Sequence, residues 1–248
     1  MLFVGTHHKT GTQLLLRVCR DIGAELGLKF FEGWQRDLPA DTDIWFMLHS
    51  RVDATAIPNL RGAHLVRHPL NLLCSGYRYH RECTERWCIS TEHATGADGI
   101  RYDFEGLTYQ QKLNSVPTQE GIRIEMRGRS YNAIMDMYAW DYANPDLRTW
   151  QFEEVMSDFD GAMSEILTFL GLPESMLDVA RRHDVKRMSL ATRDQNAHVT
   201  DKDGTLSWER YFTPELLEEF RAMYPPDLFA RLGYAEPVLP LADAQHLG

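Results

Sequence analysis

Short apolar runs alternate with amphipathic segments along most of this chain. The run at residues 2–5 precedes a segment in which Leu15, Val18 and Ile22 recur at helical spacing on one face. The predicted elements are strand 2–5, helix 12–25, strand 44–48, strand 64–67, helix 70–81, strand 148–152 and helix 160–170. This alternation predicts an α/β fold in which helices flank both faces of a central parallel sheet.

Residues 82–143 interrupt the alternation. Aromatic side chains and arginines are scattered through this segment, namely Trp87, Arg101, Tyr102, Phe104, Tyr109, Arg123, Arg127 and Arg129. We interpret 82–143 as a mostly helical or irregular insertion or cap near the mouth of a binding site, with a helix over 129–143. The alternative is a structural excursion that packs on the core. Residues 1–248 then form one domain that ends in a loose tail, 236–248.

The turn after the first strand carries a lysine. The turn reads Gly5-Thr6-His7-His8-Lys9-Thr10-Gly11-Thr12. Backbone N–H groups at a helix N-terminus carry partial positive charge and the lysine adds a full charge, so the turn predicts a site for a phosphate-like anion. It differs from the ATP/GTP P-loop because Lys9 precedes Gly11 and no glycine comes just before the lysine. The alternative is a plain strand–helix turn with an exposed lysine.

A second strand–turn–helix unit carries an arginine. Arg67 lies where the strand 64–67 ends, and Pro69 suits the first turn of the following helix. Ser75 lies eight residues after Arg67, nearly two turns into that helix. Arginine binds terminal phosphates through two parallel hydrogen bonds, so Arg67 and Ser75 could hold one anion at the edge of the sheet. A surface salt bridge and a surface hydroxyl are the alternatives.

Composition and charge narrow the classes of protein. The chain has 248 residues and a net charge of −10, which argues against general nucleic-acid binding because that needs a basic face. No apolar stretch is long enough to span a membrane and no leader is visible, so we expect no membrane span. The four cysteines are Cys19, Cys74, Cys83 and Cys88. We favour reduced thiols in a cytoplasmic protein over a local Cys83–Cys88 disulfide.

Together these motifs resemble the sulfotransferases that use 3′-phosphoadenosine 5′-phosphosulfate (PAPS) and release adenosine 3′,5′-bisphosphate (PAP). Lys9–Thr12 resembles the family's 5′-phosphosulfate loop, and Arg67–Tyr77 resembles its 3′-phosphate motif. The stretch 149–173 and the tail 204–234 are similar to later parts of the family. The resemblance implies a P-loop-like fold, PAPS as the cofactor and an acceptor that is a small molecule, lipid or glycan. It implies these cofactor-binding residues: Lys9, Thr10, Gly11, Thr12, Gln13, Arg67 and Ser75.

The chain departs from the family pattern in the first loop, in the closing loop and at Met47, where the family usually has a lysine two residues before the strand-end histidine. Gln13 and Leu14 stand where the family usually has a threonine and often a tryptophan. The family's closing loop carries Arg-Lys-Gly before its tryptophan, whereas this chain has Asp201-Lys202-Asp203 before Gly204. Lys202 is therefore the candidate for the remaining phosphate contact, and Arg193 is a substitute.

Sulfuryl transfer needs in-line positioning, charge stabilisation and a general base. The resemblance implies that Lys9 stabilises the leaving group and that no metal is required. His49 is the first candidate for the base, because it follows strand 44–48 and cytosolic relatives have a histidine at that strand end. Glu32 is the second, since glycan-modifying relatives place a glutamate at a similar distance after the lysine; a third possibility is neither. We expect His7 and His8 to shape the pocket, and His68 and His80 to be structural.

Two other functions stay open. A P-loop kinase for a small metabolite would need an aspartate at a strand end to hold magnesium, whereas the strand ends here offer His49 and Arg67. A non-catalytic nucleotide-binding module would keep the fold and lack the base. The sequence leaves the oligomeric state open, a homodimer included.

Overall fold

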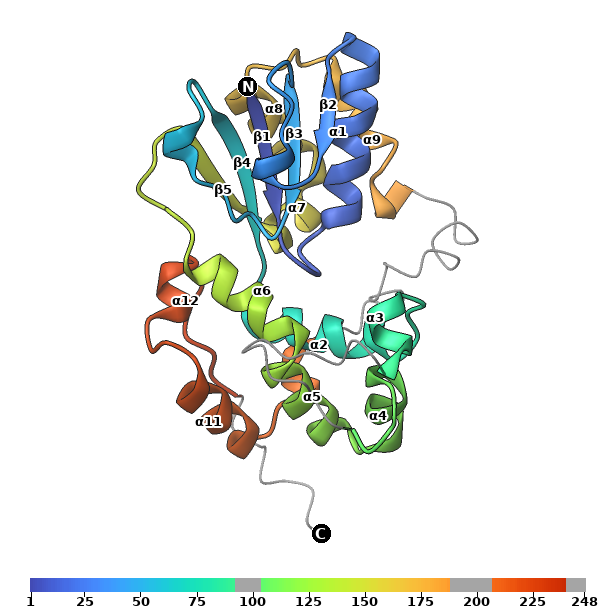
Figure 1. Cartoon of the computed structure of the whole chain (residues 1–248). Helices are drawn as coiled ribbons and strands as arrows, with labels where there is room; N and C mark the ends of the chain where they lie inside the picture. Colours follow the sequence, from blue (N-terminus) through green and yellow to red (C-terminus); the bar gives the residue numbers. More distant parts are fainter. Residues whose placement is uncertain (92–103, 188–206, 240–248) are drawn as a thin grey trace.

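A five-stranded parallel sheet forms the centre of the computed structural model, which describes residues 1–91, 104–187 and 207–239 (Figure 1). The strands are β1 (Leu2–Thr6), β2 (Phe30–Glu32), β3 (Ile44–Leu48), β4 (Arg61–Val66) and β5 (Leu147–Gln151). Their order is β2-β3-β1-β4-β5, with every neighbouring pair parallel. Because β1 lies between β3 and β4, the carboxyl ends of these three strands lie side by side.

Alternation along each strand separates two apolar surfaces. Val4, Phe46 and Leu65 belong to one core cluster, whereas Phe3 and Trp45 belong to another on the opposite face. The first face is covered by α1 (Thr12–Leu26), α7 (Phe152–Ser157), α8 (Phe159–Leu170) and α9 (Met176–Arg181). The second face is covered by segments around the short 3₁₀ helices η1 (Gln35–Asp37) and η2 (Ala54–Ala56), together with Trp140. The sheet is therefore flanked by helices as predicted, but the long helices lie on one face.

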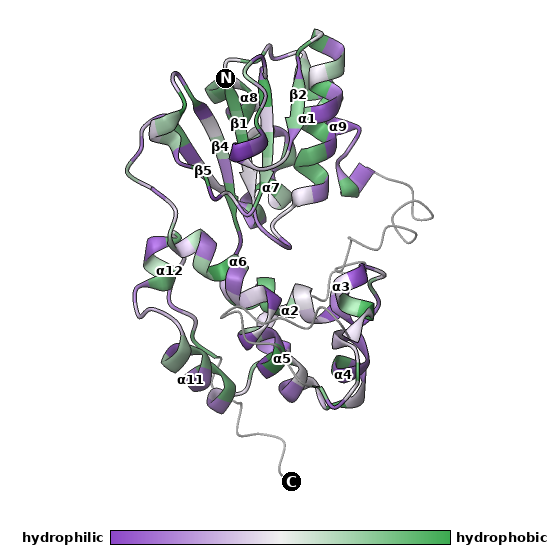
Figure 2. Cartoon of the chain, in the orientation of Figure 1, coloured by the Kyte–Doolittle hydropathy of each residue, from purple (hydrophilic) through white to green (hydrophobic). Residues whose placement is uncertain are grey.

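A helical layer lies beyond the carboxyl ends of the strands (Figure 1). Its helices are α2 (Pro69–His80), α3 (Arg86–Ile89), α4 (Tyr109–Ser115), α5 (Thr118–Arg127), α6 (Arg129–Tyr138), α11 (Pro214–Met223) and α12 (Leu228–Arg231). Leu73 of α2, Ile122 of α5 and Phe220 of α11 share one buried cluster. Hydrophilic and hydrophobic residues alternate along these helices, as amphipathic helices require (Figure 2). The described part of 82–143 is thus mostly helical and packs with α2.

The predicted boundaries agree closely with most elements. Strand 44–48 is found as predicted, and helix 12–25 extends by one residue. The predicted helix 129–143 was too long, because α6 ends at Tyr138 and Trp140 turns back to stack on Phe3 and His64. The three-residue strand β2 and the helix α9 were not predicted. Of the predicted tail 236–248, residues 240–248 lie outside the described residues.

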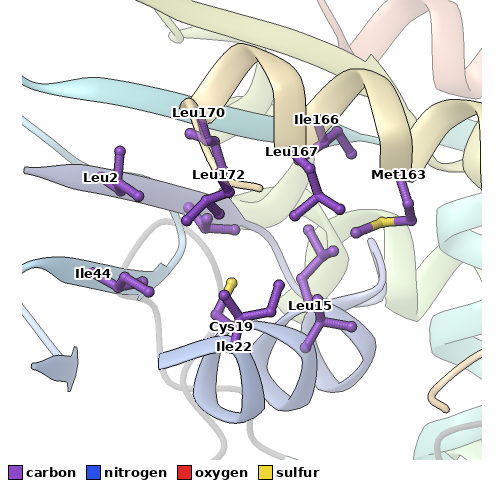
Figure 3. Close-up of a pocket in the computed structure, with 12 residues that line it drawn as sticks. Leu2, Leu15, Cys19, Ile22, Ile44, Met163, Ile166, Leu167, Leu170 and Leu172 are labelled. Carbon is purple, nitrogen blue, oxygen red and sulfur yellow. The ribbon is translucent and has the colours of Figure 1, made fainter. Parts of the chain in front are cut away.

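The core between the sheet, α1 and α8 encloses a small cavity of about 20 Å³ (Figure 3). Leu15 and Ile22 from α1 approach Leu167 and Met163 from α8 across this space. Every residue that lines it is apolar or a cysteine, and none belongs to the predicted anion site. The cavity is a packing feature of the core.

Leu167→Ala is expected to enlarge this cavity and lower the free energy of unfolding by about 2–5 kcal/mol. Leu167 is 2% exposed, so the lost methyl groups leave space that the rigid sheet cannot fill. The matched control is Thr168→Ala, an exposed position one residue further along α8, which should stay within about 0.5 kcal/mol of wild type. Urea unfolding measures both, and equal effects would contradict the packing assignment.

Candidate functional site

The loop between β1 and α1 is held by hydrogen bonds among its own residues. The Thr10 hydroxyl accepts from the His7 N–H (2.7 Å) and donates to the His7 carbonyl (2.9 Å). The Thr12 hydroxyl donates to the same carbonyl (2.8 Å). Lys9 adopts a positive φ of 64°, which is uncommon for a residue other than glycine. The threonines thus fix a tight turn with Lys9 at its tip.

The N-terminus of α1 suits an anion. Gly11 occupies the N-cap position with φ of 85°, no side chain caps the helix, and its first turn holds no acidic residue. The first N–H groups of a helix have no intrahelical partner, so those at Thr12 and Gln13 can donate to a ligand. A Cβ at Gly11 would also lie 3.0 Å from the Phe152 ring. The residues present therefore fit a phosphate-like group at this turn.

Arg67 joins the two predicted motifs. Its Nη1 donates to the Lys9 carbonyl (2.7 Å) and to the Ser75 hydroxyl (3.0 Å). Its guanidinium also lies over the Phe152 ring, 4.7 Å from the centroid, with a Glu153 oxygen 3.9 Å from Nε. The loop after β1, the end of β4 and helix α2 are thereby connected through one buried side chain.

The Lys9 ammonium lies close to an aromatic ring and an arginine. Its Nζ is 3.9 Å from the centroid of the Tyr79 ring. Burial of the ammonium, with a further contribution from the positive charge of Arg67, lowers the pKa of Lys9 to about 7. An anion bound at the loop would favour the charged ammonium and raise this pKa.

His49 lies at the carboxyl end of β3, as the sequence predicted. Its N–H donates to the Thr6 carbonyl (2.7 Å), and its backbone is in the left-handed region with φ of 78°. Its Nδ1 is 3.6 Å from a carboxylate oxygen of Asp136, whose other oxygen accepts from Arg51 (2.8 Å). Burial alone would raise the pKa of Asp136, but the contacts with His49 and Arg51 outweigh burial and lower it. The ring of Trp34 stacks beside His49, with centroids 6.2 Å apart.

Glu32 is not brought together with the loop by any contact in the described part of the chain. It ends β2 and forms an exposed ion pair with Arg20 of α1, at 3.2 Å. The carboxylate thus pairs with α1 on the edge strand. The other two basic candidates, Lys202 and Arg193, lie outside the described residues.

Two histidine pairs extend from the loop. His7 Nε2 lies 2.7 Å from His64 Nε2, and His64 Nδ1 lies 3.1 Å from the Thr149 hydroxyl. Burial lowers the pKa of His64 to about 3 and also lowers that of His7. His8 forms the second pair, with His80. Sequence reasoning missed these partners and Asp136 because they lie far along the chain and carry no local motif.

Three further observations concern the chain as a whole. All four cysteines are free and buried. Within the described ranges, no group of three or more His, Cys, Asp or Glu side chains is placed to hold a metal ion. No helix in the same ranges has the length and apolar character needed to cross a membrane.

Fold and site together define an α/β protein in which Lys9, Arg67 and the uncapped N-terminus of α1 lie at the carboxyl edge of a parallel sheet. A family model described as the sulfotransferase domain matches residues 48–232, well over half of the chain. The chain belongs to the sulfotransferase family. The matched range begins after the loop that carries Lys9, so only the geometry of that loop supports an anion site there. No curated protein matches the chain.

Solved structures share the fold at low sequence identity. Mouse sulfotransferase SULT7A1 complexed with PAP is 15% identical, with a TM-score of 0.50 over 90% of this chain and 82% of that one. Retinol dehydratase in complex with androsterone and inactive cofactor PAP is 11% identical, with a TM-score of 0.50 over 95% of this chain and 82% of that one. Both comparisons support the parallel sheet and its flanking helices.

Lys9 is expected to titrate near pH 7 in the ligand-free protein, because burial and Arg67 oppose its charge. NMR of side-chain-labelled lysines measures this directly. Lys29 is the internal reference, since its exposed ammonium bonds to Asp41 and its pKa is raised. Removing the charge of Arg67 with Arg67→Met should move the Lys9 titration to higher pH. A Lys9 signal that titrates together with that of Lys29 would contradict the buried, positively charged setting.

Proposed function

We propose that this chain transfers a sulfuryl group from PAPS to a hydroxyl or amine of a small-molecule, lipid or carbohydrate acceptor. The observation that carries the proposal is the position of Arg67, whose guanidinium contacts both the Lys9 carbonyl and the Ser75 hydroxyl. These contacts gather two anion-binding motifs from distant parts of the sequence into one site. Membership of the sulfotransferase family supports sulfuryl transfer, and the PAP-bound solved structures support this choice of donor.

The loop after β1 binds one end of the donor, and Arg67 with Ser75 of α2 binds the other. The N–H groups of Gly11, Thr12 and Gln13 bind the 5′-phosphate at the start of α1, while the N–H of Thr10 donates to the His7 carbonyl (3.2 Å) and shapes the loop. Lys9 stabilises the charge that develops on the leaving group. Arg67 and Ser75 bind the 3′-phosphate, with Lys202 and Arg193 as further candidates for that contact. PAPS supplies the activated sulfuryl group; the protein contributes position and charge.

His49 is proposed as the general base that takes the acceptor's proton. Asp136 supports this role, because its carboxylate lies 3.6 Å from Nδ1 and can stabilise the imidazolium that forms. Glu32, the second candidate, is less favoured because Arg20 pairs with its carboxylate. The acceptor is proposed to lie beside His49, where the ring of Trp34 is 41% exposed. The four free thiols support a reducing, cytoplasmic compartment.

The donor site is tested by calorimetric titration with PAP beside ATP and magnesium. Arg67→Ala is expected to weaken PAP binding by about 2–5 kcal/mol, at least about thirtyfold, because a phosphate loses its charged partner. The matched control is Arg148→Ala, which removes an exposed arginine that pairs with Glu165 and should leave PAP binding unchanged. Thermal melting of each variant separates lost binding from lost folding.

The other outcomes of this titration choose between functions. Binding of ATP with magnesium and no binding of PAP would replace the sulfotransferase proposal with a small-metabolite kinase. Binding of neither nucleotide by the folded wild type would favour a module that has lost its donor site.

The base is tested by turnover with labelled PAPS and an acceptor found by screening hydroxyl and amine compounds. His49→Gln is expected to lower kcat by about 10²–10⁴-fold while PAP binding is kept, since general-base catalysis contributes that much. Asp136→Asn should lower kcat to a smaller extent. Glu32→Gln should leave kcat unchanged, and a loss confined to that variant would transfer the role to Glu32. Turnover that survives both His49→Gln and Glu32→Gln would refute both assignments.

A further inference from the structure

A hydrogen-bonded chain of side chains runs from the loop into the helical layer. His8 Nε2 lies 2.8 Å from His80 Nε2, and His80 Nδ1 lies 2.5 Å from Glu125 Oε1. The other oxygen of Glu125 accepts from the Ser130 hydroxyl (2.7 Å). The rings of His8 and His80 are nearly parallel, with centroids 4.9 Å apart. The loop, α2, α5 and α6 each contribute one member.

The inner members of this hydrogen-bonded series of side chains surround a buried carboxylate. His80, Glu125 and Ser130 are each 0% exposed. Gly76 of α2 leaves room for them, because a Cβ there would lie 2.6 Å from Ser130 Oγ and 3.0 Å from Glu125 Oε2. A buried carboxylate is costly unless it is paired, and here His80 and Ser130 are its partners. The negative charge of Glu125 therefore stabilises positive charge on His80 and, through it, on His8.

The hydrogen bonds determine which ring nitrogen of His8 is available. An ionised Glu125 accepts the Nδ1 proton of His80, which leaves His80 Nε2 as an acceptor. With a neutral His80, His8 donates its Nε2 proton to His80, so its own Nδ1 carries a lone pair. When His8 takes a proton at Nδ1, the positive charge is shared toward His80 and balanced by Glu125.

His8 lies beside the ammonium of Lys9. Both side chains approach the Tyr79 ring, which is 3.9 Å from Lys9 Nζ and 6.0 Å from the His8 ring. The second histidine of the loop, His7, differs because its hydrogen bonds lead through His64 to the hydroxyl of Thr149, and the charge of Asp136 acts on it through space and not through a hydrogen bond. Of these two series of hydrogen bonds, the one that starts at His8 leads to a carboxylate.

We propose that His8 is a further, proton-dependent cation of the donor site beside Lys9 and Arg67, which takes up a proton when a nucleotide 5′-phosphate binds beside Lys9, while Glu125 balances the charge through His80. The inference rests on the proposed function, because it assumes that this loop holds the donor. The proton comes from solvent, and no covalent bond changes. By taking up the proton, His8 makes the loop more positive when the negatively charged phosphate is bound.

Charged groups from several elements face His8. They are His80 from α2, Lys9 from the loop itself, Arg129 from α6 and His49 after β3. Burial and these positive or titratable groups lower the pKa of His8 well below its usual value in the ligand-free protein. A bound phosphate reverses the local sign of charge, so protonation becomes favourable on binding.

The test is calorimetric titration with PAP at about pH 6 in two buffers of different ionisation enthalpy, which gives the number of protons taken up. Lys9, with its pKa of about 7, is already mostly charged at that pH and contributes little. Wild type is expected to take up about one proton more than His8→Gln, and about one more than Glu125→Gln. Glu120→Gln removes a more exposed carboxylate of α5 and should keep the wild-type value.

Each remaining outcome is decisive. Equal proton uptake by wild type, His8→Gln and Glu125→Gln would overturn the inference while leaving the donor site intact. Failure of the wild type to bind PAP would instead overturn the proposed function on which it rests. Should Glu125→Gln fail to fold, His8→Gln decides alone, because it keeps the His80–Glu125 pair.

Discussion

The buried guanidinium of Arg67 is the interaction on which the site depends. A buried charge is costly unless it is paired or hydrogen-bonded, and here the Lys9 carbonyl and the Ser75 hydroxyl accept from Nη1 while the Phe152 ring and the Glu153 carboxylate lie beside the guanidinium. These partners come from different connections at the carboxyl edge of the sheet. The contacts of Arg67 therefore fix the loop after β1 against α2, and the proposed anion site is a consequence of that packing.

Local charge outweighs the charge of the whole chain at this edge. The protein carries a net charge of −10, yet Lys9, Arg67 and the uncapped N-terminus of α1 lie together at one end of the sheet. Because the long-range field is screened in salt, a ligand at the site responds mainly to these groups. The low pKa of Lys9 follows mainly from burial of its ammonium, and the nearby positive charge of Arg67 lowers it further until an anion enters.

Features with a local signal were predictable from the sequence, and features made by distant contacts were not. Strand 44–48 follows from periodicity and is found as predicted. Arg67 and Ser75, eight residues apart, lie in contact, while their binding of one anion stays a prediction. Strand β2 escaped prediction because three residues are too few to show a period. Asp136 and Glu125 reach the site from 87 and 45 residues beyond their histidines, His49 and His80, on helices whose patterns report only a buried face.

The two histidine pairs of the loop differ in one chemical respect, and this difference separates their roles. In the His7 pair, the His64 ring stacks against Trp140 and the hydrogen bonds end at a hydroxyl, while the charge of Asp136 reaches His7 through space and not through a hydrogen bond. The hydrogen bonds of the His8 pair end at Glu125, and Gly76 of α2 leaves room for this carboxylate because it has no Cβ. A fold that needed only to anchor the loop would gain nothing from burying a carboxylate there, because a neutral partner serves equally well at lower desolvation cost. A buried Glu125 has a function if His8 carries a positive charge, because the carboxylate balances that charge through His80.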